Sequence, residues 1–232
     1  MADEREWRDG FAHIPYRPLR LDSDQGLQRG RALYEELEQR RSVRYFSDAP
    51  VPRELIETAI RAAGTAPSGA HMQPWTFVAI SDPEIKRQIR TAAETEERES
   101  YEGGRMSEEW LEALRPMGTD WKKPYLETVP WVVVLFAQHK GMNEDGTKRK
   151  HYYVRESVGI SAGLFITALH RMGLCTLTHT PSPMGFLTEI LKRPSHERPM
   201  VLFPIGYCAE DATVPEIDRK PLSDIAVWFE SD

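Results

Sequence analysis

The longest helical stretch of the sequence runs from residue 151 to residue 172 and is apolar almost all round. A helix without a polar face has to be covered by other parts of the protein. Small residues recur along it, and small side chains let a second helix approach closely. They are Ser157, Gly159, Ser161, Ala162 and Gly163. The stretch therefore predicts a central helix, either buried within one subunit or lying at a subunit interface, and composition favours neither alternative.

Four shorter runs have the branched and aromatic composition that is typical of β-strands. The run at 131–136, Trp-Val-Val-Val-Leu-Phe, is apolar throughout, which indicates a strand buried on both faces. The other predicted strands are 75–80, 174–180 and 201–207.

Helical spacing of apolar residues predicts helices over 27–39 and 52–63. A capping box at 81–84, Ser-Asp-Pro-Glu, predicts the start of a further helix. Residues 140–150 have the composition of a polar loop. Because helices and strands alternate irregularly, the sequence indicates an α+β or layered α/β fold.

Two segments do not have the composition of a core. Residues 1–26 are polar and proline-dotted, and they predict an N-terminal arm. Residues 94–124 carry many charges, a Gly-Gly pair and two tryptophans among polar residues. Such a segment is typical of an inserted lid that orders over a ligand. With no internal repeat, the 232 residues are expected to form a single domain over 1–232.

The composition excludes several classes of protein. A net charge of −6 with mixed signs argues against a nucleic-acid partner. The two cysteines, Cys175 and Cys208, are too few for a disulfide framework and predict a reducing cytoplasm. Residues 1–24 lack the apolar run of a secretory signal, and the longest apolar stretch, 131–137, is too short to span a bilayer. We therefore expect a soluble, cytoplasmic protein without a membrane partner.

Two short runs carry the densest set of binding groups. Residues 40–46 read Arg-Arg-Ser-Val-Arg-Tyr-Phe, which offers many donors to a phosphate and to a heterocycle. Residues 66–75 read Ala-Pro-Ser-Gly-Ala-His-Met-Gln-Pro-Trp, and their small residues let the backbone approach a flat ligand and direct N–H groups at it. An arginine-rich run alone is usually a solvated surface, but the pair predicts the two edges of a nucleotide-like cofactor. The histidines show no metal spacing, and no zinc, Walker or Rossmann signature is present.

These two runs resemble the flavin-dependent nitroreductase superfamily, and the resemblance covers nearly everything after residue 30. It continues through Pro130-Trp131 and through residues 157–163, 174–181, 204–207 and 219–221. Within the superfamily, residues 119–128, preceded by Glu97 and Tyr101, are similar to the iodotyrosine deiodinase family. Simple nitroreductases lack this segment. The sequence shows no N-terminal membrane anchor of the vertebrate kind, so it is similar to the soluble bacterial members.

The resemblance implies a three-layer α/β/α fold with a mixed sheet flanked by helices. It also implies an intertwined homodimer with FMN at the subunit interface. The FMN phosphate and pyrimidine edge would be bound by Arg40, Arg41, Ser42 and Arg44, with Arg219 at the phosphate. The flavin ring would be lined from the other subunit by Pro67, Ser68 and Gly69. It would also be reached by Thr178 and Thr180. A hydroxyl donor near N5 suits stepwise one-electron chemistry, so Thr180 is the implied catalytic residue. His179 stands where relatives more often have Thr or another small residue.

The implied reaction is the reductive dehalogenation of a halotyrosine, iodotyrosine and also bromo- or chlorotyrosine, to tyrosine and halide. Glu97 and Tyr101 are spaced so that they share one face of a helix. By resemblance, Glu97 accepts hydrogen bonds from the substrate α-ammonium, while Tyr101 and Lys123 donate to the α-carboxylate. The backbone N–H of Ala70 would bind the phenolate.

Alternatives remain open at several of these points. Without the resemblance, Glu97 belongs to a charged helix face among other glutamates, and Lys122 competes with Lys123. A general nitroreductase or flavin reductase acting on nitroaromatics or quinones is the first alternative function, and a non-catalytic flavin- or halotyrosine-binding protein is the second. Because no nicotinamide-binding motif is visible, a separate reductase or a ferredoxin is considered as the electron donor. The preferred halogen is not specified by these residues.

Overall fold

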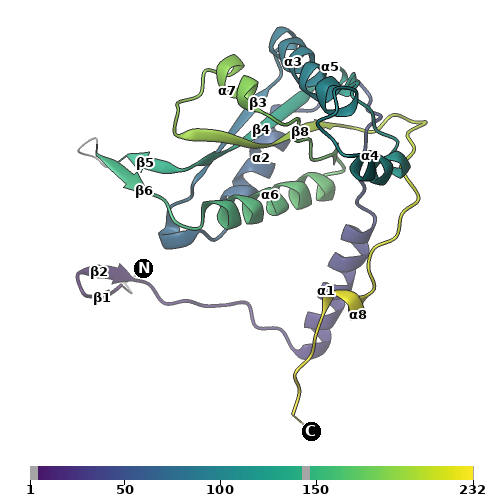
Figure 1. Cartoon of the computed structure of the whole chain (residues 1–232). Coiled ribbons are helices and arrows are strands. Elements are labelled where there is room, and N and C mark those ends of the chain that lie inside the picture. The colour runs from purple at the N-terminus through teal and green to yellow at the C-terminus, as the bar shows by residue number, and fades with distance from the viewer. Residues whose placement is uncertain (1–4, 143–146, 232) are drawn as a thin grey trace. The chain divides into compact units, whose positions relative to one another are not determined.

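A computed structural model describes residues 5–142 and 147–231 of the chain (Figure 1). It divides into two compact units, with the boundary between Gln39 and Arg40. Every residue predicted above to bind cofactor or substrate lies at or beyond Arg40. The candidate site therefore belongs to the second unit.

The N-terminal unit contains a hairpin and a helix. Strands β1 (Glu6–Arg8) and β2 (Phe11–His13) pair antiparallel. Helix α1 (Ser23–Glu38) begins where the Asp22 carboxylate accepts a hydrogen bond from the backbone N–H of Gln25 at 2.8 Å. This cap starts the helix before the predicted residue 27. The hairpin falls within the predicted arm, where composition alone did not indicate strands.

The second unit is built on a four-stranded sheet in the order β3-β4-β8-β7. Its strands are β3 (Trp75–Ile80), β4 (Trp131–Gln138), β7 (Cys175–Thr176) and β8 (Glu197–Gly206). Neighbouring strands pair antiparallel, and an isolated parallel bridge joins Ser42 to Thr176. Of the predicted strand at 174–180, only β7 forms a continuous ladder with β8. The segment meets β8 again at an antiparallel bridge between His179 and Leu202.

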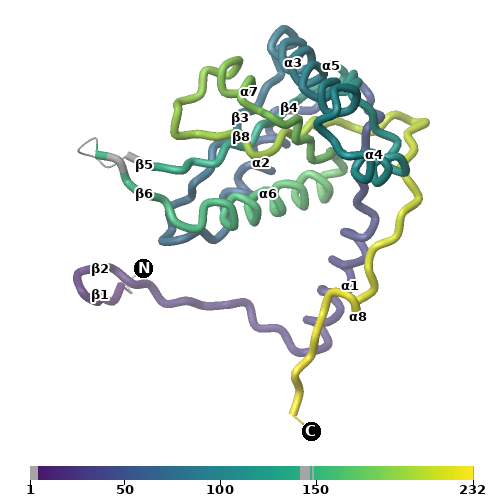
Figure 2. The backbone as a smooth tube through the Cα atoms, in the orientation of Figure 1, coloured from purple at the N-terminus to yellow at the C-terminus, as the bar shows by residue number. Residues whose placement is uncertain are grey.

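Strand β4 has an apolar side chain at nearly every position, and alternate positions build two separate cores. One core contains Val132, Val134 and Phe136, and the other contains Val133, Leu135 and Ala137. The first core packs against α3 (Pro83–Tyr101), α5 (Tyr125–Thr128) and α7 (Gly185–Ile190). The second packs against α2 (Arg53–Gly64) and α6 (Val154–Arg171). Figure 2 shows α3 and α6 on opposite sides of the strands, so the fold is the expected α+β arrangement of three layers.

Helix α6 corresponds to the long apolar stretch of the sequence. It begins at Val154, later than predicted, and buries Val158, Phe165 and Leu169 against the sheet. Its other side remains uncovered in the single chain, where Ile160 is 46% and Leu164 is 36% exposed.

Helix α3 begins differently from the prediction. The residue that caps it is Asp82, whose carboxylate accepts hydrogen bonds from the N–H groups of Glu84 (2.8 Å) and Ile85 (3.1 Å). The predicted capping box is wrong, because the Glu84 side chain bonds forward to Arg87 and Gln88 instead of back to Ser81.

The remaining elements are short. They are η1 (Gly69–His71), α4 (Glu108–Leu114), η2 (Arg115–Met117), β5 (Lys140–Met142), β6 (Lys148–Lys150) and α8 (Leu222–Ile225). The polar loop predicted at 140–150 is wrong at its two ends, because β5 and β6 pair antiparallel there, and residues 143–146 lie outside the described part. Within the residues that the structure describes, no helix has the length and apolarity needed to cross a membrane.

Candidate active site

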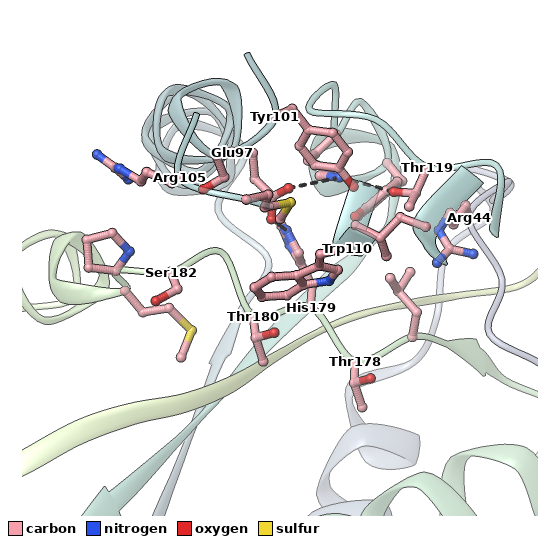
Figure 3. A pocket seen from close by; sticks show the side chains of 18 of the residues that line it. Arg44, Glu97, Tyr101, Arg105, Trp110, Thr119, Thr178, His179, Thr180 and Ser182 are labelled. Carbon is pink, nitrogen blue, oxygen red and sulfur yellow. Dashed lines mark hydrogen bonds and ion pairs between the residues drawn. The ribbon is translucent and has the colours of Figure 1, made fainter. Parts of the chain in front are cut away.

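A cavity of about 570 Å³ lies between α3, the segment that follows it, and residues 177–180 (Figure 3). Six of the predicted site residues line it, namely Arg44, Glu97, Tyr101, Lys123, Thr178 and Thr180. Apolar walls are added by Met106, Trp110, Leu114, Met184 and Met200. The fold therefore brings predicted cofactor-binding and substrate-binding residues, far apart in sequence, to one cavity.

Three ionisable side chains are buried together in the wall of this cavity. Glu97, Lys123 and His179 are respectively 8%, 3% and 5% exposed. The Glu97 carboxylate has a separate partner for each oxygen. Its Oε1 lies 3.1 Å from Nε2 of His179, and its Oε2 lies 3.4 Å from Nζ of Lys123. A buried carboxylate needs such partners to remain charged.

Burial and pairing act in opposite directions on these groups. Burial raises the pKa of Glu97, but the hydrogen bond from His179 and the charge of Lys123 together outweigh it, so the pKa lies below its ordinary value. Burial lowers the pKa of His179 and of Lys123, and the Glu97 carboxylate only partly offsets this. Near neutral pH, Glu97 is therefore an anion and His179 a neutral imidazole.

Lys123 is held by several contacts. Its ammonium donates hydrogen bonds to the carbonyl oxygen of Asp120 and to Oγ1 of Thr119, the latter at 3.3 Å. It also lies 5.5 Å from the centre of the Tyr101 ring. The backbone N–H of Lys123 donates to Oε1 of Glu94 at 2.7 Å, which ties this residue to α3.

The two adjacent lysines, Lys122 and Lys123, have different environments. Lys122 is exposed, and its ammonium lies 5.5 Å from the centre of the Trp121 ring, outside the cavity lining. Among the glutamates of α3, only Glu97 lines the cavity, whereas Glu96 forms an ion pair with Arg105 at 2.5 Å.

The helical repeat of α3 explains why Glu97 points inward. Ile89, Ala93 and Glu97 follow one another at intervals of one turn, and all are buried. The apolar stripe that packs on the sheet thus continues directly into the carboxylate. Tyr101 lies one turn further on the same face, as its spacing predicted.

A second cavity, of about 270 Å³, adjoins the first through a shared residue. Among its lining residues are Arg40, Arg41, Ser42, Arg44 and Arg219. Arg44 lines this cavity and the larger one, and its buried Nε has no hydrogen-bond partner among the described residues. Burial lowers the pKa of Arg40, and the charges of Arg219 and Arg41 lower it further. Such a concentration of positive charge favours an anionic ligand.

The loop that carries Pro67, Ser68, Gly69 and Ala70 lies elsewhere. None of these residues lines the larger cavity of the same chain. The N–H of Gly69 donates to the Ser157 hydroxyl at 3.4 Å, which holds the loop against α6. Ala70 adopts a left-handed conformation with φ 50°. The structure therefore does not bring these residues to the other predicted site residues within one chain.

Sequence reasoning did not identify His179 as the partner of Glu97, nor Thr119 and Asp120 as partners of Lys123. No periodic pattern links these positions, because the contacts form between segments that are distant in sequence or irregular in structure. The position of His179 between Thr178 and Thr180 was the available signal. Within the described part of the chain, no group of three or more His, Cys, Asp or Glu side chains is arranged to hold a metal ion.

The three-layer fold agrees with comparisons to known proteins. The chain belongs to the nitroreductase family, whose sequence model matches residues 37–207. It is 52% identical over 218 residues to the iodotyrosine deiodinase of Haliscomenobacter hydrossis. The aligned residues make up 94% of this chain and 98% of the relative. It is 44% identical over 229 residues to iodotyrosine deiodinase 1 of Mus musculus, covering 97% and 80% respectively.

A solved structure supports the same relationship. The crystal structure of an oxidized iodotyrosine deiodinase bound to FMN and 3-iodo-L-tyrosine superposes with a TM-score of 0.72 at 29% identity. The match covers 86% of this chain and 100% of the other chain.

Proposed function

We propose that this chain is an FMN-dependent dehalogenase that converts 3-iodotyrosine to tyrosine and iodide. The reaction replaces a carbon–iodine bond by a carbon–hydrogen bond, consumes two electrons and one proton, and releases iodide. The observation that carries the proposal is the buried Glu97–Lys123 pair with Tyr101 in a cavity that adjoins an arginine-lined one. Relatives at 52% and 44% identity bear the corresponding name. We include bromo- and chlorotyrosine among the substrates.

The residues of the smaller cavity fit FMN. A phosphate is an anion that arginine binds with paired hydrogen bonds, and the guanidinium groups of Arg40 and Arg41 crowd together with that of Arg219. The unpartnered Nε of Arg44 is a donor available at the junction of the two cavities. We assign the phosphate and the pyrimidine edge to these arginines and Ser42, with Thr178 and Thr180 at the ring. When bound and reduced, FMN supplies the two electrons.

The residues of the larger cavity fit the amino-acid end of the substrate. Glu97 carries the negative charge that an α-ammonium requires, while Lys123 and the Tyr101 hydroxyl are donors suited to an α-carboxylate. In the structure the carboxylate of Glu97 and the ammonium of Lys123 lie 3.4 Å apart and neutralise each other. A zwitterion offers both groups a partner of the opposite sign at the same time, so an amino acid is preferred to a simple aromatic compound.

We further propose that the enzyme is a homodimer. The uncovered side of α6, with Ile160 and Leu164, offers an apolar face for a second copy. The loop containing Pro67, Ser68 and Gly69 would line the flavin of the partner subunit, and the N–H of Ala70 would bind the substrate phenolate. A separate reductase or a ferredoxin would supply electrons. The free thiols Cys175 and Cys208 suit the reducing cytoplasm.

The function is tested with the purified FMN-loaded protein. Titration with 3-iodotyrosine should quench flavin fluorescence to saturation, and anaerobic reduction with dithionite should then yield tyrosine and iodide in equal amounts. The matched ligand 3-(4-hydroxy-3-iodophenyl)propionate has no ammonium group and should bind far more weakly. Turnover of nitrobenzene without quenching or product from 3-iodotyrosine would instead identify a general nitroreductase.

The cofactor assignment makes a separate prediction. Replacement of Arg44 by Gln should weaken FMN binding by about 10- to 100-fold, because a charge-assisted hydrogen bond contributes about 1.5–3 kcal/mol. The dissociation constant is measured by titrating FMN-free protein and following flavin fluorescence. Arg61→Gln, an equivalent change at an exposed position of α2, is the control. Equal FMN affinity in the two variants would remove Arg44 from the cofactor site.

A further inference from the structure

The backbone of His179 is hydrogen-bonded to β8, although residue 179 lies outside the continuous ladder between β7 and β8. Its backbone N–H donates to the carbonyl oxygen of Leu202 at 2.8 Å, and its carbonyl oxygen accepts from the N–H of Leu202 at 2.9 Å. The imidazole is directed into the buried group, where Nε2 lies 3.1 Å from Oε1 of Glu97. A side chain anchored by β8 thus fixes the orientation of a carboxylate that belongs to α3.

The charged and titratable groups around this imidazole come from every element packed on it. Glu97 faces it from α3, Lys123 from the segment before α5, and Arg44 from the segment after α1. The Tyr125 ring of α5 lies edge-on, with ring centres 6.0 Å apart. Nδ1 of the imidazole is buried and has no hydrogen-bond partner among the described residues.

The protonation state of His179 decides how much negative charge Glu97 presents. A neutral imidazole donates through Nε2 and leaves the carboxylate charge uncompensated on that side. An imidazolium would neutralise this charge and would add a second cation beside Lys123. The burial of His179 and the charges of Lys123 and Arg44 lower its pKa, so the neutral form prevails near neutral pH.

We propose that His179 is a positioning residue that orients Glu97 toward the substrate ammonium and makes halotyrosine binding depend on pH. This inference rests on the proposed function. Because the substrate ammonium and an imidazolium proton compete for the same carboxylate, each opposes the binding of the other. Affinity should therefore fall as the pH decreases through the pKa of His179 in the ligand-free protein, and ligand binding in that range should release protons.

The test measures dissociation constants of 3-iodotyrosine for the FMN-loaded protein from about pH 8 to about pH 5. Affinity of the wild type should weaken in the acid range, by at most about tenfold per pH unit for one proton. His179→Gln keeps an N–H donor near the Nε2 position but does not titrate, so it should retain affinity at pH 8 within about threefold and lose the part of the acid weakening that is due to His179. His179→Leu removes the donor and should bind about tenfold more weakly at pH 8.

Two controls separate this effect from others. Titration of the ligand phenol affects wild type and His179→Gln alike, so only the difference between their profiles reports on His179. Calorimetry of wild type and His179→Gln in buffers of different ionisation enthalpy counts the released protons, and the excess in the wild type is the share of His179. The desamino ligand 3-(4-hydroxy-3-iodophenyl)propionate has the same phenol but no ammonium, so its pH profile and proton release should be the same for wild type and His179→Gln.

The outcomes distinguish this inference from the function on which it rests. A steeper loss of affinity in acid and a larger proton release in the wild type than in His179→Gln support the inference. Superimposable pH profiles of wild type and His179→Gln, with Glu97-dependent binding intact, overturn the inference alone. Absence of 3-iodotyrosine binding to the wild type at pH 8 overturns the proposed function and the inference together.

Discussion

Replacement of Glu97 by Gln should weaken 3-iodotyrosine binding by about 100-fold while FMN binding stays within about twofold. The change removes the negative charge that we propose to face the substrate ammonium, and a charge-assisted contact of this kind contributes about 1.5–3 kcal/mol. It also leaves Lys123, which is 3% exposed, without its ion-pair partner. The unpaired buried ammonium lowers the stability of the free variant, because it is poorly solvated, but it does not weaken binding of a ligand whose carboxylate pairs with it.

The measurement is a fluorescence titration of each FMN-loaded variant with 3-iodotyrosine. Glu99→Gln is the matched control, because Glu99 belongs to the same helix but is exposed and does not line the cavity. The control should bind like the wild type. If Glu97→Gln and Glu99→Gln bind equally well, the amino-acid end of the substrate is not recognised by α3, and a nitroreductase activity without a zwitterion requirement becomes the better explanation.

Much of the layered fold follows from patterns that are local in sequence. The run at 131–136 had to be a buried strand, because every side chain in it is apolar, and it became the central part of β4 with a core on each face. The amphipathic helix at 52–63 matches α2 to within one residue at each end. The hairpin of β5 and β6 was missed because its strands, Lys-Gly-Met and Lys-Arg-Lys, are short and mostly polar, so alternation of apolar residues could not reveal it.

From residue patterns alone, the candidate site was predictable only where a motif is continuous, and the remaining residues came from the family resemblance. The arginine run at 40–44 lines the smaller cavity as its composition suggested, and the family resemblance chose Glu97 and Lys123 from among similar neighbours. The geometry then shows a physical reason for that choice, since Glu97 continues the buried stripe of α3. The contact between Glu97 and His179 joins residues 82 positions apart, and no local pattern encodes it.

The core behind the sheet allows an equally large prediction for stability. Phe165 on α6 is fully buried, and its ring centre lies 5.1 Å from that of Phe77 and 5.2 Å from that of Phe203. Phe165→Ala should lower the free energy of unfolding by about 3–5 kcal/mol, because it removes buried surface, leaves a cavity and breaks two aromatic contacts. Urea denaturation at fixed FMN concentration measures the change.

Thr91→Ala provides the comparison for this loss. Thr91 is exposed on α3, and its hydroxyl bonds only to the carbonyl oxygen of Arg87 one turn earlier, at 3.0 Å. Its truncation should change the free energy of unfolding by less than about 0.5 kcal/mol. A loss below about 1 kcal/mol for Phe165→Ala would mean that α6 and the sheet close the cavity by moving together. The packing of α6 on β4 would then be looser than the full burial of Phe165 indicates. A rigid three-layer packing would instead retain a cavity where the phenyl ring was removed.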